Sequence, residues 1–204
     1  MINSQLSQQI QFIVEIDKLK NILRQNLITD ASRRENSAEH SWHLAMMAIV
    51  LKDYAPVDVD LLRVMKMLLV HDLVEIDAGD TFCYDVQGNQ DKASRELVAA
   101  DRLFGLLPPE QGAELRAVWE EVEAQATSSA QFAAALDRSC GCHNRLQPFL
   151  QNQQTQGGTW RIHSITPQQI LQRMAPIKTF TPELWGLIEE GLEEAIAAGY
   201  ISAK

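Results

Sequence analysis

The chain has 204 residues and a formal net charge of −9, and 46% of its residues are hydrophobic and 22% charged. This length and balance are typical of a soluble globular protein with one core, or at most two small domains. The acidic surplus argues against binding to long nucleic acids, which depends on clustered Lys and Arg, but it does not exclude a small phosphorylated ligand.

Two observations on the N-terminal half concern the cellular location of the protein. The longest apolar run, LAMMAIVL, is eight residues, far shorter than a membrane span. The N-terminal stretch MINSQLSQQI lacks the basic and apolar regions of a secretion signal. We therefore expect a cytoplasmic protein that makes no contact with a membrane.

Apolar residues recur with the period of an α-helix through most of the chain. The stretch of residues 5–27 predicts one long helix, and Ser37 is expected to cap a second. A third helix, capped by Asp58, contains the apolar segment LLRVMKMLLV. Residues 78–90 are rich in Gly, Asp and Asn and predict a loop.

The second half of the chain continues the helical pattern. Further helices are expected from KASRELVAADRLFGLL, after the two prolines 108–109, and from SSAQFAAALDRSCGCHNRLQPFLQN, and QNQQTQGG is the expected hinge or exposed loop. Thr166 opens a capping box with Pro at the first helical position, Thr181 begins the last helix, and Gly199 ends it. No segment alternates with the period of a strand, so the predicted fold is all-α, a single-domain helical bundle over residues 1–204.

The three cysteines fit a reducing compartment. Cys140 and Cys142 lie next to His143, but the spacing is wrong for a zinc ribbon and no second half exists. We interpret them as free thiols near a helix packing face.

Two polar residues interrupt the third helix where it should be buried. His71 and Asp72 are followed directly by Leu73 and Val74. An ionised Asp in an apolar interior costs several kcal/mol unless it is paired, and the nearby Lys66 can reach outward to water. A divalent metal would satisfy both groups, because imidazole and carboxylate are good ligands for Zn, Mn, Co or Fe.

A metal needs further ligands, which facing helices of a bundle can supply. His40 lies in the first turn of the second helix, and Asp137 follows a run of small apolar residues. Each residue also has an ordinary alternative, such as a core His bonded to a carbonyl or an Asp137–Arg138 pair. Spacing alone leaves both interpretations open.

The segments around these residues resemble a known family. RRENSAEHSWHLA is similar to the R-x-E-N-x-x-E-H-S segment of bacterial 5'-deoxynucleotidases and their relatives in the HD-domain superfamily of metal-dependent phosphohydrolases. VHDLVEIDAGD is similar to that family's H-D-x-x-E-x-x-x-G-D, and AALDR to its later Asp. The resemblance covers roughly residues 10–150, and helices at about 165–200 would complete the bundle.

The resemblance implies a role for each matching residue. Glu75 would orient or deprotonate the attacking water, Asp80 would also serve catalysis, and Arg24 and Arg33 would bind the substrate phosphate. His43 is expected to pack beside the site rather than bind a second metal. The ligands of one divalent ion (Mn, Co, Zn, Fe or Mg) would be His40, His71, Asp72 and Asp137.

The activity implied is removal of the 5'-phosphate from (deoxy)nucleoside monophosphates by a metal-activated water. The protein is expected to be a homodimer. Trp119 and Trp185 would cover a partner surface or close the core. The family has a Trp after its phosphate-binding Arg, where it excludes a ribose 2'-hydroxyl; Gln25 stands there in this chain, so no sugar preference is predicted. Two alternatives stay open. The same site would act on a nucleoside di- or triphosphate or a cyclic nucleotide, or the bundle would bind metal or nucleotide without catalysis.

Overall fold

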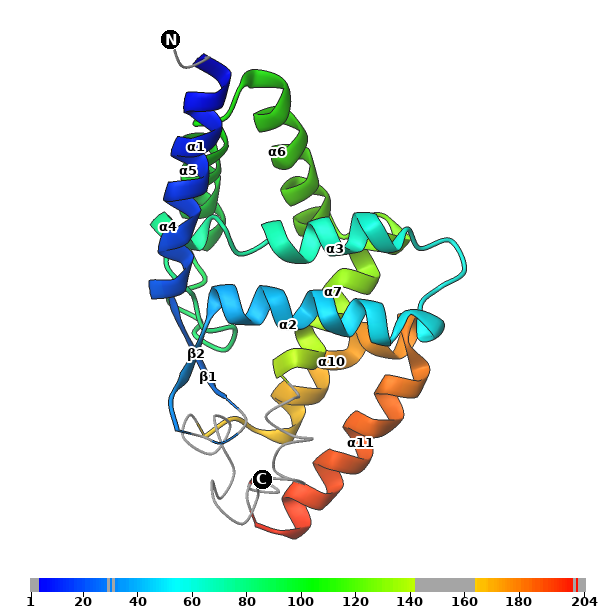
Figure 1. Cartoon of the computed structure of the whole chain (residues 1–204). Helices are drawn as coiled ribbons and strands as arrows, with labels where there is room; N and C mark the ends of the chain where they lie inside the picture. The colour runs from blue at the N-terminus through cyan, green and yellow to red at the C-terminus, as the bar shows by residue number, and fades with distance from the viewer. Residues whose placement is uncertain (1–3, 29, 31, 142–163, 200, 202–204) are drawn as a thin grey trace.

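A computed structural model describes residues 4–28, 30, 32–141, 164–199 and 201. Helices dominate these residues, which confirms the all-α prediction, and two short strands form the one sheet among them. Figure 1 shows the helices α2 and α3 crossing the middle of the molecule. The helices are α1 (Ser4–Ile16), α2 (Ser37–Val50), α3 (Leu61–Val70), α4 (Glu75–Ala78), α5 (Lys92–Phe104), α6 (Pro109–Ala124), α7 (Ser128–Gly141), α10 (Pro167–Phe180) and α11 (Pro182–Ala197), with short 3-10 turns at Asp17–Asn21 and Lys52–Tyr54.

The prediction of one helix over residues 5–27 is wrong in its second half. After α1 the chain makes a 3-10 turn and then becomes extended as β1 (Leu23–Leu27), which pairs antiparallel with β2 (Arg34–Asn36). The strand pairs with a segment only a short way further along the chain, and this backbone pairing overrides the helical period of the apolar residues. This hairpin carries Arg24 to the start of α2.

Side-chain caps define several helix starts. Asn36, one residue before the predicted cap, begins α2 with a capping box to Glu39. Asp60 rather than Asp58 caps α3, because the Asp58 carboxylate instead accepts a hydrogen bond from Ser128. The predicted capping box at Thr166 is confirmed at the start of α10.

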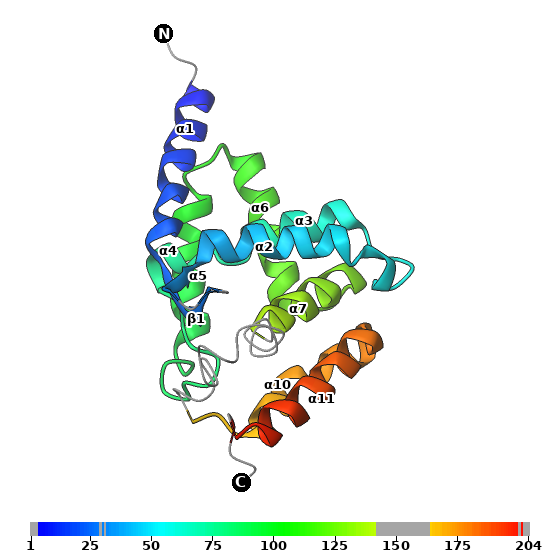
Figure 2. The same ribbon diagram turned by 60° about the horizontal axis from the view of Figure 1, so that its bottom comes forward.

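Two apolar cores hold the described helices together. In the larger core, α3 packs against α2, α6 and α7, and its fully buried residues include Leu44, Met67, Leu103, Val118 and Phe132. The smaller core lies between α10 and α11 and reaches α7 through Ala135 (Figure 2). None of the described helices is long and apolar enough to cross a membrane.

Helix α6 lies close to the end of α5 at Gly112. A Cβ at this position would come within 2.5 Å of the Phe104 carbonyl oxygen. We expect Gly112→Ala to lower the free energy of unfolding by about 1–3 kcal/mol, the usual cost of overpacking. Gly186→Ala in α11 is the matched control, because nothing lies within 4 Å of its new Cβ. That variant should gain about 0.5–1 kcal/mol in a urea titration, and equal losses in both would contradict the close approach.

Candidate active site

The centre of the site lies where α3 ends. His71 occupies the C-cap of α3, and the chain then turns through Asp72 into the short helix α4. His71 Nδ1 lies 3.0 Å from the Leu68 carbonyl oxygen, so it donates the proton and leaves the lone pair on Nε2. That Nε2 is buried and has no hydrogen-bond partner among the described residues. The sequence predicted a continuous buried helix here, whereas the helix breaks at the two polar residues.

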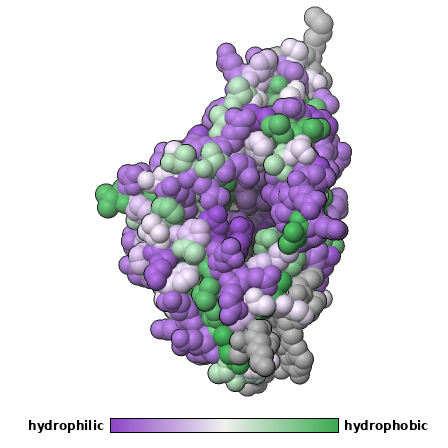
Figure 3. Space-filling model, turned by 180° about the vertical axis from the view of Figure 1, so that it is seen from behind, coloured by the Kyte–Doolittle hydropathy of each residue, from purple (hydrophilic) through white to green (hydrophobic). Residues whose placement is uncertain are grey.

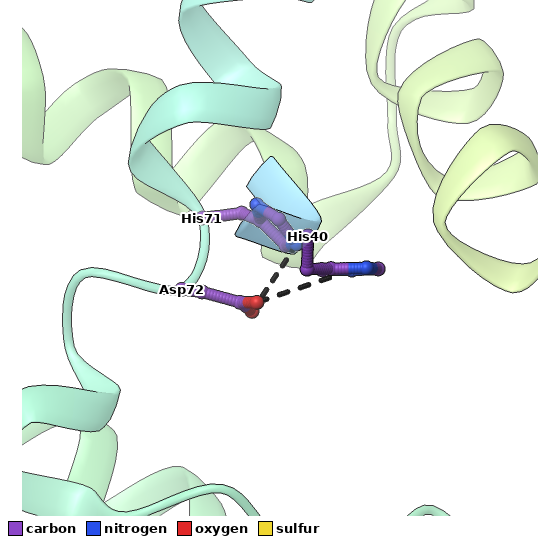
Figure 4. A group of neighbouring side chains, drawn as sticks. All are labelled: His40, His71 and Asp72. Atoms are coloured by element: carbon purple, nitrogen blue, oxygen red, sulfur yellow. Dashed lines mark ion pairs between the residues drawn. The ribbon is translucent and has the colours of Figure 1, made fainter. Parts of the chain in front are cut away.

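The four predicted metal ligands meet in space. The closest ligand atoms of His40, His71 and Asp72 all lie within 4.8 Å of one another (Figure 4). His40 Nε2 lies 3.0 Å from Asp137 Oδ1 and 4.0 Å from Asp72 Oδ2, and His71 Nε2 lies 3.1 Å from Asp72 Oδ1 and 3.9 Å from Asp137 Oδ1. Helices α2 and α7 and the end of α3 therefore each contribute to one cluster.

This donor set fits a divalent transition metal. Two imidazoles and two carboxylates suit Zn, Mn, Co or Fe, and the buried lone pair of His71 Nε2 faces two carboxylates. His40 is fully buried, and its other ring nitrogen, Nδ1, lies 3.6 Å from Glu35 Oε2. This separation is too long for a hydrogen bond, so Glu35 is a neighbouring charge of the ring and not a hydrogen-bond acceptor for it. Sequence reasoning missed Glu35, although it lies in the R-x-E-N segment.

Asp137 stays ionised in this cluster. Burial alone would raise its pKa, but the hydrogen bond from His40 and the charges of His40, His71 and Arg24 hold it well below the usual range. The helix position that looked unfavourable for a charge is thus compensated by partners from other helices.

Arg24 supplies the cation nearest to the cluster. Its Nη1 donates to Asp72 Oδ2 at 2.6 Å, and Arg34 Nε donates to the Arg24 carbonyl oxygen at 2.5 Å, which fixes the strand. Burial works against the charge, but the surrounding carboxylates, led by Asp72 and Asp137, raise the Arg24 pKa. Lys66 does not pair with the cluster and instead forms an ion pair with Glu114.

Arg33, the second predicted phosphate ligand, is not brought to this place. It is exposed, and its guanidinium forms two hydrogen bonds to the Glu39 carboxylate, at 2.7 and 2.8 Å. It is absent from the lining of the cavity described below. Arg33 lies in a bend directly before β2, and a motif match in sequence does not say in which direction its side chain extends.

Glu75 and Asp80 both face the site from α4 and the loop after it. Glu75 is 5% exposed and accepts a hydrogen bond of 2.7 Å from Ser37 Oγ. Burial raises its pKa to about 9, with a further contribution from Asp72, while Arg24 opposes the shift. Burial likewise raises the pKa of Asp80, against the charge of Arg24. Gly79, with φ of 75°, permits the turn that places Asp80 beside Glu75.

A polar cavity of about 280 Å³ opens in front of the cluster. On the face opposite to that of Figure 1, the molecule is hollowed and mainly hydrophilic (Figure 3). Gln25 belongs to the lining, together with all the predicted site residues except His40 and Arg33. Sequence reasoning missed other charged lining residues. No motif surrounds Lys92, Glu96, Glu123 and Arg173, and sequence reasoning considers Arg138 only as a partner of Asp137.

Three remaining predictions concern His43, the cysteines and the expected hinge. His43 is half-buried and stacks on Trp42 with ring centroids 6.2 Å apart, as expected of a packing residue, and it lies outside the ligand set. Cys83 lines the cavity, and burial raises the pKa of its thiol. The Cys140 side chain, Cys142, His143 and the predicted hinge QNQQTQGG lie outside the described residues.

The fold and the cluster define a class: a helical bundle that gathers His and Asp ligands from several helices beneath a polar cavity. The family model of the HD domain matches residues 16–185. The chain therefore belongs to the HD-domain family, as its resemblance implied.

Comparison with individual proteins agrees with this assignment. The human protein named 5'-deoxynucleotidase HDDC2 is 32% identical over 130 residues, which cover 63% of this chain and 62% of the human protein. The match thus spans less than two thirds of that relative's length. A crystal structure from Magnetospirillum magnetotacticum MS-1, named a predicted metal-dependent phosphohydrolase, is 51% identical with a TM-score of 0.86 and covers 98% of this chain and 99% of its own. The PH0347 protein of Pyrococcus horikoshii OT3 is 23% identical with a TM-score of 0.59, covers 93% of this chain and 99% of its own, and shares the fold.

Proposed function

We propose that this chain is a metal-dependent phosphohydrolase that removes the 5'-phosphate from nucleoside monophosphates. The observation that carries the proposal is the meeting of the His and Asp cluster, Arg24 and Glu75 in one cavity. The names of the human relative and of the Magnetospirillum neighbour support the same reaction class. The alternatives, a larger or cyclic phosphoester or a role without catalysis, predict a different substrate or none.

Each residue of the cavity has a chemical task in this proposal. His40, His71, Asp72 and Asp137 would hold a divalent ion, which would supply Lewis acidity toward a phosphoryl oxygen and lower the pKa of water. The Arg24 guanidinium holds non-bridging oxygens of the phosphate, which suits its planar donor geometry.

The two carboxyl groups beyond the cluster would handle protons. Glu75, oriented by Ser37, would accept the proton of the attacking water, because the charge of a bound divalent ion would lower its carboxyl pKa from the raised metal-free value. Asp80 has a raised pKa, which suits a group that returns a proton to the leaving 5'-oxygen. Positioning and electrostatics then supply most of the acceleration.

Phosphate release tests the proposal directly. The protein is stripped of metal, reloaded with Mn, Co, Zn or Mg, and given deoxyribo- and ribonucleoside 5'-monophosphates. Release from monophosphates supports the reaction class, and the deoxy-to-ribo ratio reports the effect of Gln25, which lines the cavity. No release by metal-loaded protein would contradict the proposal and favour one of the alternatives.

Arg24 and Arg33 offer a matched pair of variants. We expect Arg24→Met to lower kcat/KM about 100-fold, because a charge-assisted contact to a phosphate is worth about 1.5–3 kcal/mol. Arg33→Met should stay within about twofold, because its guanidinium pairs with Glu39 on the surface and such pairs contribute little. Steady-state kinetics on one monophosphate measures both, and equal losses would contradict these positions.

The remaining proposals concern the whole protein. We propose that residues 1–204 form a single HD domain, that the protein is cytoplasmic, and that its physiological metal is one of Mn, Co, Zn, Fe and Mg. A homodimer is also proposed. Trp119 is buried, so a better candidate surface is the exposed stripe of α2 formed by Trp42, Met46 and Ile49. Light scattering gives the mass, and a monomeric mass at all concentrations would contradict the dimer.

A further inference from the structure

Helix α10 contributes a guanidinium to the cavity from outside the motif-bearing segments. Arg173 lines the cavity together with Met174 of the same helix. Its Nη2 lies 4.0 Å from Asp137 Oδ2, so it faces the cluster at the distance limit of an ion pair. The side chain is 37% exposed, so water and a ligand in the cavity can reach it.

Arg173 differs from the other basic residues of the lining in its bonding. Arg24 donates to Asp72, Lys92 pairs with Glu96 at 2.6 Å, and Arg138 donates to Gln125. Among the described residues, the Arg173 guanidinium makes no hydrogen bond, and Asp137 is its one ion-pair partner. A planar group with five N–H donors is therefore available to an anion in the cavity.

Two guanidiniums approach the cluster. Arg24 contacts Asp72 from strand β1, and Arg173 approaches Asp137 from helix α10. Both charges also act on the thiol of Cys83, where they oppose the rise in pKa that burial causes. The two arginines thus approach the same part of the cavity from different elements.

We propose that Arg173 is a second phosphate-binding residue, which holds the substrate phosphate together with Arg24. This inference rests on the proposed function, since it names a residue that grips the group to be hydrolysed. A phosphomonoester carries up to two negative charges and three terminal oxygens, so two guanidiniums can bind it without sharing an oxygen. With the Asp137 charge engaged by a metal, Arg173 has no competing carboxylate among the described residues.

Binding of inorganic phosphate to the metal-loaded protein tests the role of Arg173 without turnover. The variants are Arg173→Met, which removes the charge, and Arg173→Lys, which keeps it. Lys178→Met is the matched control, because it removes a cation from α10 that lies over the Trp185 ring and outside the cavity lining. Calorimetry gives the Kd for phosphate, and circular dichroism with metal analysis verifies that each variant is folded and loaded.

We expect Kd to rise about 10- to 100-fold in Arg173→Met, with partial recovery in Arg173→Lys and no change in Lys178→Met. KM for a monophosphate should rise with Kd. An unchanged Kd in folded, metal-loaded Arg173→Met overturns the inference. If the wild type still releases phosphate from monophosphates in that case, the proposed function stands without it. If the wild type binds phosphate through Arg173 and releases none, the anion site is supported and the proposed reaction fails.

Discussion

Asp72→Asn is expected to abolish metal binding and phosphate release together. The carboxylate lies 3.1 Å from His71 Nε2 and 4.0 Å from His40 Nε2, at the centre of the ligand set. Asn keeps the shape but loses the charge that a divalent ion prefers. We expect less than about 0.1 metal per chain and a loss of kcat of at least about 1,000-fold, because Lewis acidity is removed with the ion.

The same substitution should also destabilise the metal-free protein. Asp72 pairs with Arg24 at 2.6 Å, and both side chains are largely buried. Removing one partner of a buried pair costs about 3 kcal/mol or more, because the other charge remains without compensation. Urea unfolding in the presence of a chelator measures this loss.

Asp77→Asn is the control for Asp72→Asn. Asp77 is an exposed acidic residue of the neighbouring helix α4 and pairs with Arg102 on the surface. Its loss should leave metal content and turnover unchanged and alter stability by less than about 1 kcal/mol. Full metal content in folded Asp72→Asn would show that the ion, if any, binds elsewhere.

The meeting of the candidate ligands could be predicted because several of them depart from the local pattern. His71, Asp72 and Asp137 are polar residues with apolar neighbours in the sequence, and a buried charge requires a partner from elsewhere in the fold. The structure brings these residues and His40 together. The motifs also identified Arg24, Glu75 and Asp80, and all three line the cavity.

The remaining features depend on pairing and packing between segments, which the pattern of apolar residues within one segment does not show. The β1–β2 pairing replaces the second half of a predicted helix, and the sequence pattern of residues 22–27 does not predict it. The same strand pairing positions Arg24 in the lining of the cavity, whereas Arg33 pairs with Glu39. Arg173 lies in a helix without any motif, so only the packing of α10 on α7 shows that it reaches the site.

Glu75→Gln is expected to separate metal binding from catalysis. Glu75 lies in the cavity but outside the ligand set, and Ser37 Oγ can hydrogen-bond the amide as it does the carboxylate. The variant should keep one metal per chain and lose about 100- to 10,000-fold in kcat, the usual contribution of a positioned general base. KM should change little, because Gln removes no group that holds the phosphate.

Glu123→Gln is the matched control for this loss. Glu123 also lines the cavity, and burial also raises its pKa, but it has no place in the proposed reaction. A similar fall in kcat for Glu123→Gln would mean that any cavity carboxylate matters, which would contradict the specific role of Glu75. Loss of metal in Glu75→Gln would instead make it a ligand.

The pH dependence of stability tests the environment of Glu75 independently of turnover. Burial raises its folded-state pKa from 4.5 to about 9, so between these values the unfolded chain gives up the proton first. The stability that protonated Glu75 provides is therefore complete below pH 4.5 and is lost as the pH rises toward 9. Gln cannot ionise, so metal-free Glu75→Gln should match the wild type near pH 4 and exceed it in free energy of unfolding near pH 8. If the free energies of unfolding of the two proteins, measured in urea, instead change in parallel across this pH range, the Glu75 carboxylate is already ionised in the folded protein. It could then accept a proton even without a metal.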